Sequence, residues 1–221
     1  MVRMRLLALL GLSLALVALA ADSKPPWQRL LTGDDTKKAA GLQQRIKELE
    51  TAGQYTDAIK LSEELLALRT KVQGAEHWET INQKWALTAV KKVAALPAEK
   101  RAGWRQAARG AAEAGSLEQK GHYAKALPQR QGRLGWCRKA LGEEHPSTAT
   151  SYNNVAFNLN AQGKYSEAGS LFQKALDIHR KALGEEHPDT AQSSGRGTTA
   201  MRHTPQTVVE PVELAQDWSQ E

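Results

Sequence analysis

The sequence predicts an all-α protein, a right-handed superhelical solenoid built from helix hairpins. The first observation is a hexapeptide, LGEEHP, which occupies residues 141–146 and recurs unchanged at 183–188, a spacing of 42. The second is a Gly-x-Tyr turn at 53–55, 121–123 and 163–165, between stretches with helical periodicity. A fixed period of about 20–50 residues indicates a repeat architecture, in which one helix pair cannot bury its apolar face without a neighbour.

The clearest unit lies between the two hexapeptides. Pro146 suits a first helical turn, Gly163 separates two helices, and the second helix is expected over 165–183 with Gly184 as its stop. Hydroxyl residues that offer capping oxygens to the first helix are Ser147, Thr148 and Thr150. Apolar residues at three- and four-residue steps predict the buried stripes: Tyr152, Val155, Ala156 and Leu159, then Ala168, Leu171, Phe172, Ala175 and Leu176.

Residues 1–20 are predicted to be a secretory signal peptide. Arg3 and Arg5 precede an uncharged run over 6–20 that ends in an Ala-Leu-Ala cleavage site. We expect cleavage after Ala20 and export of the mature chain, as a periplasmic or secreted protein that meets the membrane only transiently. The alternative, a retained anchor, would rest on a run shorter than the roughly 20 residues that span a bilayer.

Three further segments follow the signal peptide. Residues 21–35 are expected to be an extended lead-in, and 36–191 a helical repeat domain of about four helix pairs. The second pair is degenerate, because Pro97 ends a helix that starts near Trp78 and no Gly-x-Tyr turn follows. Residues 192–221, rich in Ser, Thr, Gln and Pro, are predicted to be a mostly disordered tail. The last pair would then leave its stacking face uncovered, which predicts weak self-association through that face.

Charge and cysteine usage exclude several classes of protein. Lys and Arg number 30 against 24 Asp and Glu, and the excess is spread along helices rather than gathered in a patch, so nucleic acid is not an expected partner. Cys137 is the only cysteine, so no intramolecular disulfide can form. Its place on a helical apolar stripe predicts a buried small side chain rather than a nucleophile.

The histidines of the repeated loops are the main candidates for metal chemistry. His77, His145 and His187 occupy one phase of the repeat, each beside acidic residues. Metal ligands must converge on one ion within about 2.0–2.6 Å, whereas equivalent positions in a solenoid are about 10 Å or more apart. We therefore interpret the histidines as structural, with a metal-binding module as a second alternative. The sequence contains no hydrolase, phosphate-loop or dinucleotide motif, so we expect no enzyme activity, no cofactor, and no catalytic or metal-ligating residue.

The repeat unit resembles the tetratricopeptide repeat. The residues that carry the resemblance are Tyr152, Val155, Ala156, Leu159, Gly163, Tyr165, Ala168, Phe172 and Ala175. The long unit, the LGEEHP loop and the run Tyr-Asn-Asn at 152–154 are similar to the kinesin-light-chain subtype. The resemblance implies a scaffold whose first helices line a concave groove for a polypeptide. On that reading the candidate peptide-binding residues are Asn153, Phe157 and Asn160, and the partner is a protein or peptide.

The chain as a whole resembles the N-terminal region of exported bacterial multi-repeat proteins. The segments that carry this likeness are the signal peptide, KPPWQRLL, EHWET, LPAEKRAGWRQAA and SYNNVAFNLNAQGKY. Such proteins often carry a caspase-like (CHAT) protease domain downstream. The resemblance implies an interaction scaffold of the cell envelope, with the alternative of a truncated regulatory repeat segment from a larger CHAT-type protease protein.

Overall fold

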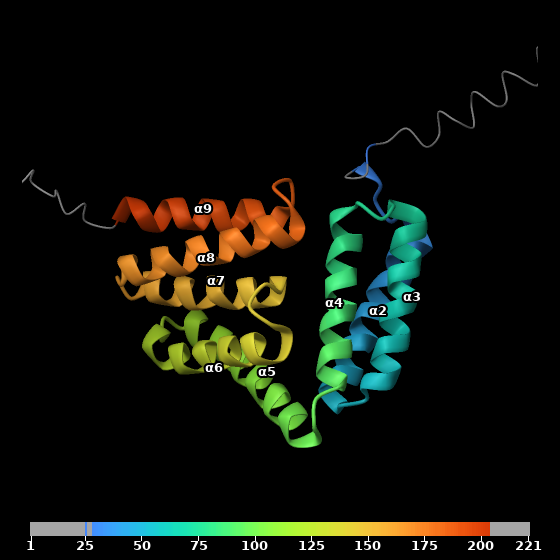
Figure 1. The fold of residues 1–221 in the computed structure, drawn as a ribbon, viewed down its shortest axis with the longest axis horizontal. Coiled ribbons are helices and arrows are strands. Elements are labelled where there is room, and N and C mark those ends of the chain that lie inside the picture. Colours follow the sequence, from blue (N-terminus) through green and yellow to red (C-terminus); the bar gives the residue numbers. More distant parts are fainter. Residues whose placement is uncertain (1–24, 26–27, 204–221) are drawn as a thin grey trace, which may run out of the picture.

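The computed structural model describes residue 25 and residues 28–203, with the side chains placed as far as residue 196. This part of the chain folds into eight α-helices and contains no strand (Figure 1). The helices are α2 (Gly33–Ala52), α3 (Tyr55–Gln73), α4 (Trp78–Ala94), α5 (Ala98–Gln119), α6 (Tyr123–Leu141), α7 (Pro146–Ala161), α8 (Tyr165–Leu183) and α9 (Pro188–His203). The predicted all-α solenoid of helix hairpins is confirmed.

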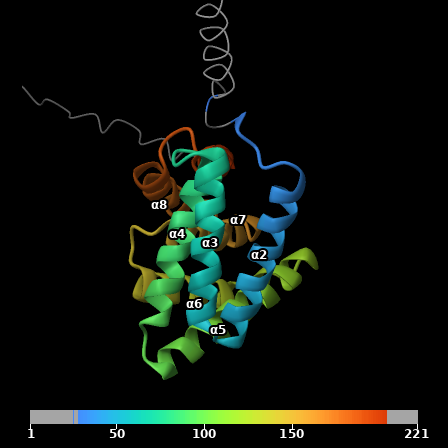
Figure 2. The same ribbon diagram turned by 90° about the vertical axis from the view of Figure 1, so that its right-hand side faces the viewer.

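Stacking of consecutive helices is interrupted at one point in the chain. Each helix packs extensively on the next, except that α4 makes little contact with α5, which pairs with α6 instead. The expected second hairpin, formed by α4 and α5, is therefore wrong. Pro97 caps α5 in an extended conformation, and the chain changes direction there. As a result α2, α3 and α4 form one layer that stands across the ends of α7, α8 and α9 (Figures 1 and 2).

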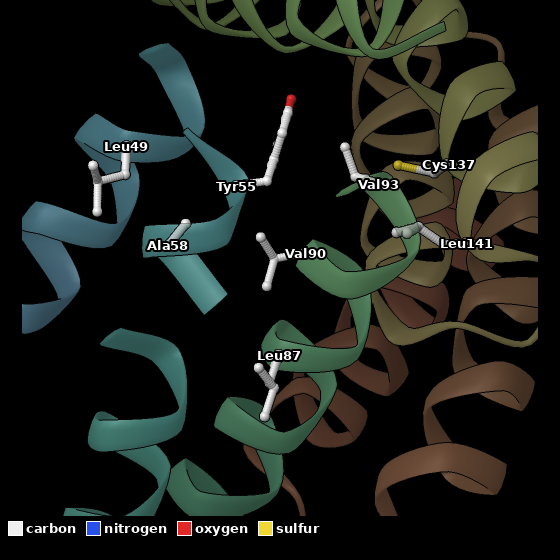
Figure 3. Packing of buried hydrophobic residues seen from close by; sticks show 8 residues of the cluster. All are labelled: Leu49, Tyr55, Ala58, Leu87, Val90, Val93, Cys137 and Leu141. Atoms are coloured by element: carbon white, nitrogen blue, oxygen red, sulfur yellow. The ribbon is translucent and has the colours of Figure 1, made fainter. Parts of the chain in front are cut away.

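One apolar cluster holds the layer of α2, α3 and α4 against α6. It joins residues of α2, α3 and α4 to Cys137 and Leu141 of α6, both almost fully buried. Figure 3 shows Val93 of α4 facing these two residues. Cys137 is 1% exposed and accepts a hydrogen bond from the Ser151 hydroxyl at 3.2 Å, so the predicted burial of this cysteine is confirmed.

The prediction of a disordered tail from residue 192 is wrong as far as residue 203, because α9 extends to His203 and packs on α8. Its polar composition misled the prediction. Thr190 and Ser193 are buried, and the Ser193 hydroxyl lies 2.8 Å from Nδ1 of His179 on α8. Buried hydrogen bonds therefore dock a helix with few apolar residues. The stacking face of α8 is covered by α9, which removes the basis on which self-association was expected. Residues 204–221 lie outside the described part of the chain.

The N-terminal predictions are tested only in part. The signal peptide over 1–20 lies outside the described residues, as does most of the lead-in, and α2 begins at Gly33, slightly earlier than expected. Among the described helices, none combines the length and the apolar character that crossing a membrane requires.

The stripe predicted for the central unit is confirmed, and it yields a stability prediction. Ala168 is fully buried where α8 meets α7, whereas Lys164 precedes α8 in an exposed turn. Ala168→Leu should lower the free energy of unfolding by about 1–3 kcal/mol, because added methylenes overpack a tight helix contact. Lys164→Ala should change it by less than about 0.5 kcal/mol. Urea denaturation followed by circular dichroism measures both, and equal effects would contradict the assigned packing.

Candidate functional site

The two copies of the hexapeptide form the same closed loop. Gly142 and Gly184 have φ of 98° and 92°, a region that side-chain-bearing residues rarely adopt. The Thr148 hydroxyl donates to the Gly142 carbonyl at 2.7 Å, and the Thr190 hydroxyl donates to the Gly184 carbonyl at 2.8 Å. Each loop thus joins the end of one helix to the start of the next through a side-chain hydrogen bond.

The loop histidines cap the helices that follow them. In each loop Nδ1 of the histidine accepts a hydrogen bond from the backbone N–H two residues later. The pairs are His77 with Glu79 at 3.2 Å, His145 with Ser147 at 3.1 Å, and His187 with Asp189 at 3.1 Å. This accounts for their repetition in phase and supports the structural interpretation. The described residues contain no group of three or more His, Cys, Asp or Glu side chains placed to hold a metal ion.

The expectation that hydroxyl side chains cap α7 is wrong, because the His145 ring caps this helix instead. Thr148 closes the loop onto Gly142, and the Thr150 hydroxyl donates to the carbonyl of Pro146 inside the helix. Ser147 takes part through its backbone N–H, which donates to the His145 ring. Histidine is an unusual capping residue, and composition rules that favour Ser, Thr, Asp and Asn pass over it.

Helix α4 contacts these loops through three side chains spaced seven residues apart. Residues at i, i+7 and i+14 lie on one face of a helix, about 10 Å apart along its axis. The contacts are Lys92 Nζ with the Leu141 carbonyl at 2.5 Å, the Trp85 ring with the His145 ring at 5.1 Å, and the Trp78 ring with the His187 ring at 6.3 Å. We call this row the α4 brace. It fixes the orientation of the N-terminal layer against the ends of the later helices.

The three residues predicted to bind a peptide do not share one environment. Asn153 is 3% exposed, and its amide donates to the Ser193 hydroxyl at 2.7 Å, so α9 covers it. Asn160 is half-buried, and its side-chain oxygen has no hydrogen-bond partner. Phe157 is 42% exposed. Asn153 was expected to line an open groove, and its burial in the contact between α7 and α9 corrects that expectation. Binding by Phe157 and Asn160 stays a prediction.

The accessible stripe of α7 agrees with the predicted one at Phe157 and Asn160 but not at Asn153. Thr150, Phe157 and Ala161 are exposed, whereas Asn154 and Asn160 are partly exposed. Asn158, at 0% exposure, donates to Glu118 of α5 at 2.9 Å. The sequence carried a signal for this stripe in the helical spacing of these residues, but the two buried asparagines obscured it.

Aromatic and cationic side chains gather where α6, α7 and α9 meet around this stripe. The Tyr123 ring meets the Phe157 ring edge-on, with 6.3 Å between centroids. The Arg196 guanidinium of α9 lies 5.9 Å from the centre of the Phe157 ring, within the range of a cation–π contact. We call Tyr123, Asn154, Phe157 and Arg196 the Phe157 surface. An exposed aromatic residue flanked by arginine can make apolar, stacking and charged contacts with a polypeptide.

Burial of the three loop histidines, and of His179 in α8, predicts a loss of stability in acid. Burial, and then the charge of Lys92, lower the pKa of His145 to about 4, and burial also lowers the pKa of His77, His179 and His187. Folding therefore favours the neutral rings. Their contribution should be complete above about pH 6.5 and should fall as the pH drops toward 4. For His145 alone the loss is up to about 3 kcal/mol.

Replacement of the ring tests this prediction. His145→Asn keeps a capping oxygen but cannot titrate, so the variant should lose less stability than the parent between pH 6.5 and 4. The same substitution at the exposed His122 is the matched control. Chemical denaturation at several pH values provides the measurement, and identical pH profiles for His145→Asn and the parent would refute the prediction.

Comparison with known proteins finds a family model and solved structures that the repeat resembles. No curated protein matches the chain. The similar structures include nearly identical TPR-like repeats of a kinesin light chain candidate from Podosopora anserina. That match is 20% identical with a TM-score of 0.38, and covers 74% of this chain and 65% of the other, just under two thirds. A single-substitution form of those repeats matches at 20% identity with a TM-score of 0.42, over 80% of this chain and 91% of the other. A family model for the tetratricopeptide repeat matches residues 148–189, which span most of α7, all of α8 and the start of α9.

Proposed function

We propose that this protein is a non-catalytic scaffold that binds a polypeptide through the Phe157 surface. Tetratricopeptide repeats generally mediate protein–protein interaction, and the family match at 148–189 includes Phe157. The observation that carries the proposal is the exposure of this one ring. The residues beside it, Ala156 and Asn158, are fully buried, whereas 42% of Phe157 is open to solvent.

The composition of the surface supports a polypeptide as its ligand. Aromatic residues and arginine are enriched among the side chains that dominate protein interfaces. Asn154 adds an amide that can both donate to and accept from a peptide backbone. The intramolecular contacts with Tyr123 and Arg196 hold the Phe157 ring in place, which reduces the entropy lost on binding.

Site-specific crosslinking tests this surface. A photoreactive phenylalanine analogue at Phe157 should capture a polypeptide from the compartment in which the protein resides, and the same analogue at Leu30 is the matched control. Leu30 is also an exposed large apolar residue, at 63%, but precedes the repeats. With the captured polypeptide purified, Phe157→Ala should weaken binding by at least ten-fold, while Leu30→Ala should leave affinity unchanged. Equal capture at both positions, or equal affinity of both variants, would refute the proposal.

The identity of the captured polypeptide distinguishes an interaction scaffold of the cell envelope from a regulatory segment of a larger protease protein. An interaction scaffold of the cell envelope should capture an envelope protein. A regulatory segment of a larger CHAT-type protein should instead capture a caspase-like protease domain. The chemistry proposed for Phe157 is the same in both.

We further propose that the protein is exported. The support is the sequence of residues 1–20, with two arginines, an uncharged run and an Ala-Leu-Ala site. When the natural gene is expressed in a bacterial host, N-terminal sequencing of the mature protein should begin at Ala21, and fractionation should recover it outside the cytoplasm. A cytoplasmic chain that retains residues 1–20 would contradict this proposal.

A further inference from the structure

A cleft of about 440 Å³ lies where the stacking of helices is interrupted. Helices α2, α3 and α4 form one side of it, and α5 with part of α6 forms the other. It exists because α5 turns away from α4 at Pro97 and packs on α6. Its volume falls in the range of sites for small organic ligands, about 300–1,000 Å³.

The walls of the cleft combine apolar surface with positive charge. Val90, Val93 and the Trp104 ring contribute apolar area. Four of the residues that line the cleft are basic, and one, Glu50, is acidic. The basic residues are Lys47, Arg105, Arg109 and Arg133. A ligand with a negative charge and an apolar body matches this lining.

Two residues that line the cleft each carry a buried polar atom without a hydrogen-bond partner. Tyr55 is 6% exposed, and its hydroxyl makes no hydrogen bond. Figure 3 shows its ring extending away from Ala58 and Val90 with the hydroxyl at the far end. One terminal nitrogen of Arg133, Nη1, is also buried without an acceptor. A buried donor without an acceptor destabilises a fold, and an acceptor on a ligand would satisfy both donors.

Arg133 is held in position but is not neutralised by contact. Its guanidinium lies 3.9 Å from the centre of the Trp104 ring, and this contact fixes its plane. Glu50 is half-buried, and burial raises the pKa of its carboxyl while the charge of Arg133 opposes that rise. No ion pair joins these two described side chains, so their charges interact only across the cleft.

We propose that this cleft binds a small amphipathic organic anion. The acid group of the ligand accepts hydrogen bonds from the Arg133 guanidinium and the Tyr55 hydroxyl, and its apolar body lies against Trp104, Val90 and Val93. An inorganic anion would leave the apolar wall uncovered, and a neutral apolar compound would leave both donors unsatisfied. This site is separate from the Phe157 surface, and neither proposal depends on the other.

A pair of fluorescent probes tests the need for an acid group separately from the need for an apolar body. The first is 1-anilinonaphthalene-8-sulfonate, and the second is N-phenyl-1-naphthylamine, which has the same aromatic body without the acid group. Fluorescence titration of the purified chain should show one sulfonate probe bound per protein, with an affinity at least ten-fold higher than that of the neutral probe. Absence of binding, or equal affinity for both probes, would overturn the proposal.

Variants of the lining residues locate the bound probe. Arg133→Met, which keeps an unbranched apolar stem but removes the guanidinium, should weaken sulfonate binding at least ten-fold and leave binding of the neutral probe unchanged. Glu50→Gln should strengthen the sulfonate, because it removes an opposing carboxyl. Arg45→Met is the matched control, since Arg45 is an exposed α2 arginine paired with Glu48 and does not line the cleft. Unchanged sulfonate affinity in Arg133→Met or Glu50→Gln, or an equal loss in Arg45→Met, would place the probe elsewhere and refute the site.

Tyr55→Phe checks that these effects arise from the ligand contacts and not from unfolding. The Tyr55 hydroxyl has no partner in the free protein, so its removal should not lower the melting temperature. The variant should nevertheless bind the sulfonate several-fold more weakly than the parent does. Unchanged sulfonate affinity would show that the hydroxyl does not reach the ligand and would contradict the proposed geometry.

Discussion

The contact of α4 with the ends of the later helices is the constraint on which the rest of this structure depends. Here the α4 brace meets the chain at Leu141, His145 and His187. Its spacing of seven residues, about 10 Å along a helix, is close to the distance between packed helices, about 8–10 Å. One straight helix can therefore contact both the loop before α7 and the loop before α9.

The brace requires loops of uniform shape. Each loop presents a histidine ring whose Nδ1 is occupied by the helix N-terminus, so the same ring both caps a helix and meets a tryptophan. A positive-φ glycine and a buried threonine close each loop at its other end. The repeated LGEEHP hexapeptide thus has two roles. It ends one helix and caps the next in the same way each time, and it forms the surface that α4 contacts.

Both candidate binding regions follow from this geometry. Because α5 turns away from α4 at Pro97 and packs on α6, the cleft lined by Tyr55, Trp104 and Arg133 remains between α4 and α5. The Phe157 surface is formed by helices that stack regularly. There, buried amides fix the neighbours of α7: Asn158 bonds to α5 and Asn153 bonds to α9. Such polar ties are directional, so they specify the positions of α5 and α9 more closely than apolar contact alone would.

The sequence by itself determined the local structure of the repeat. Its period, its Gly-x-Tyr turns and its apolar stripes placed α8 at residues 165–183, and they identified Ala168 and Phe172 as buried. These features depend on residues close together in the chain, where spacing alone decides which side chains share a face.

Tertiary structure decided which residues of α7 are accessible and how α4 lies against the later helices. Whether Asn153 faces solvent depends on α9, and the helical state of α9 depends on Ser193 meeting His179 and Asn153 of other helices. The position of the layer formed by α2, α3 and α4 depends on Trp78 and Trp85 meeting loops that lie far away in the chain. The sequence alone does not identify such contacts, because each is formed by a pair of residues that only the folded chain brings together. Even the seven-residue spacing of Trp78, Trp85 and Lys92 does not say what lies opposite these side chains.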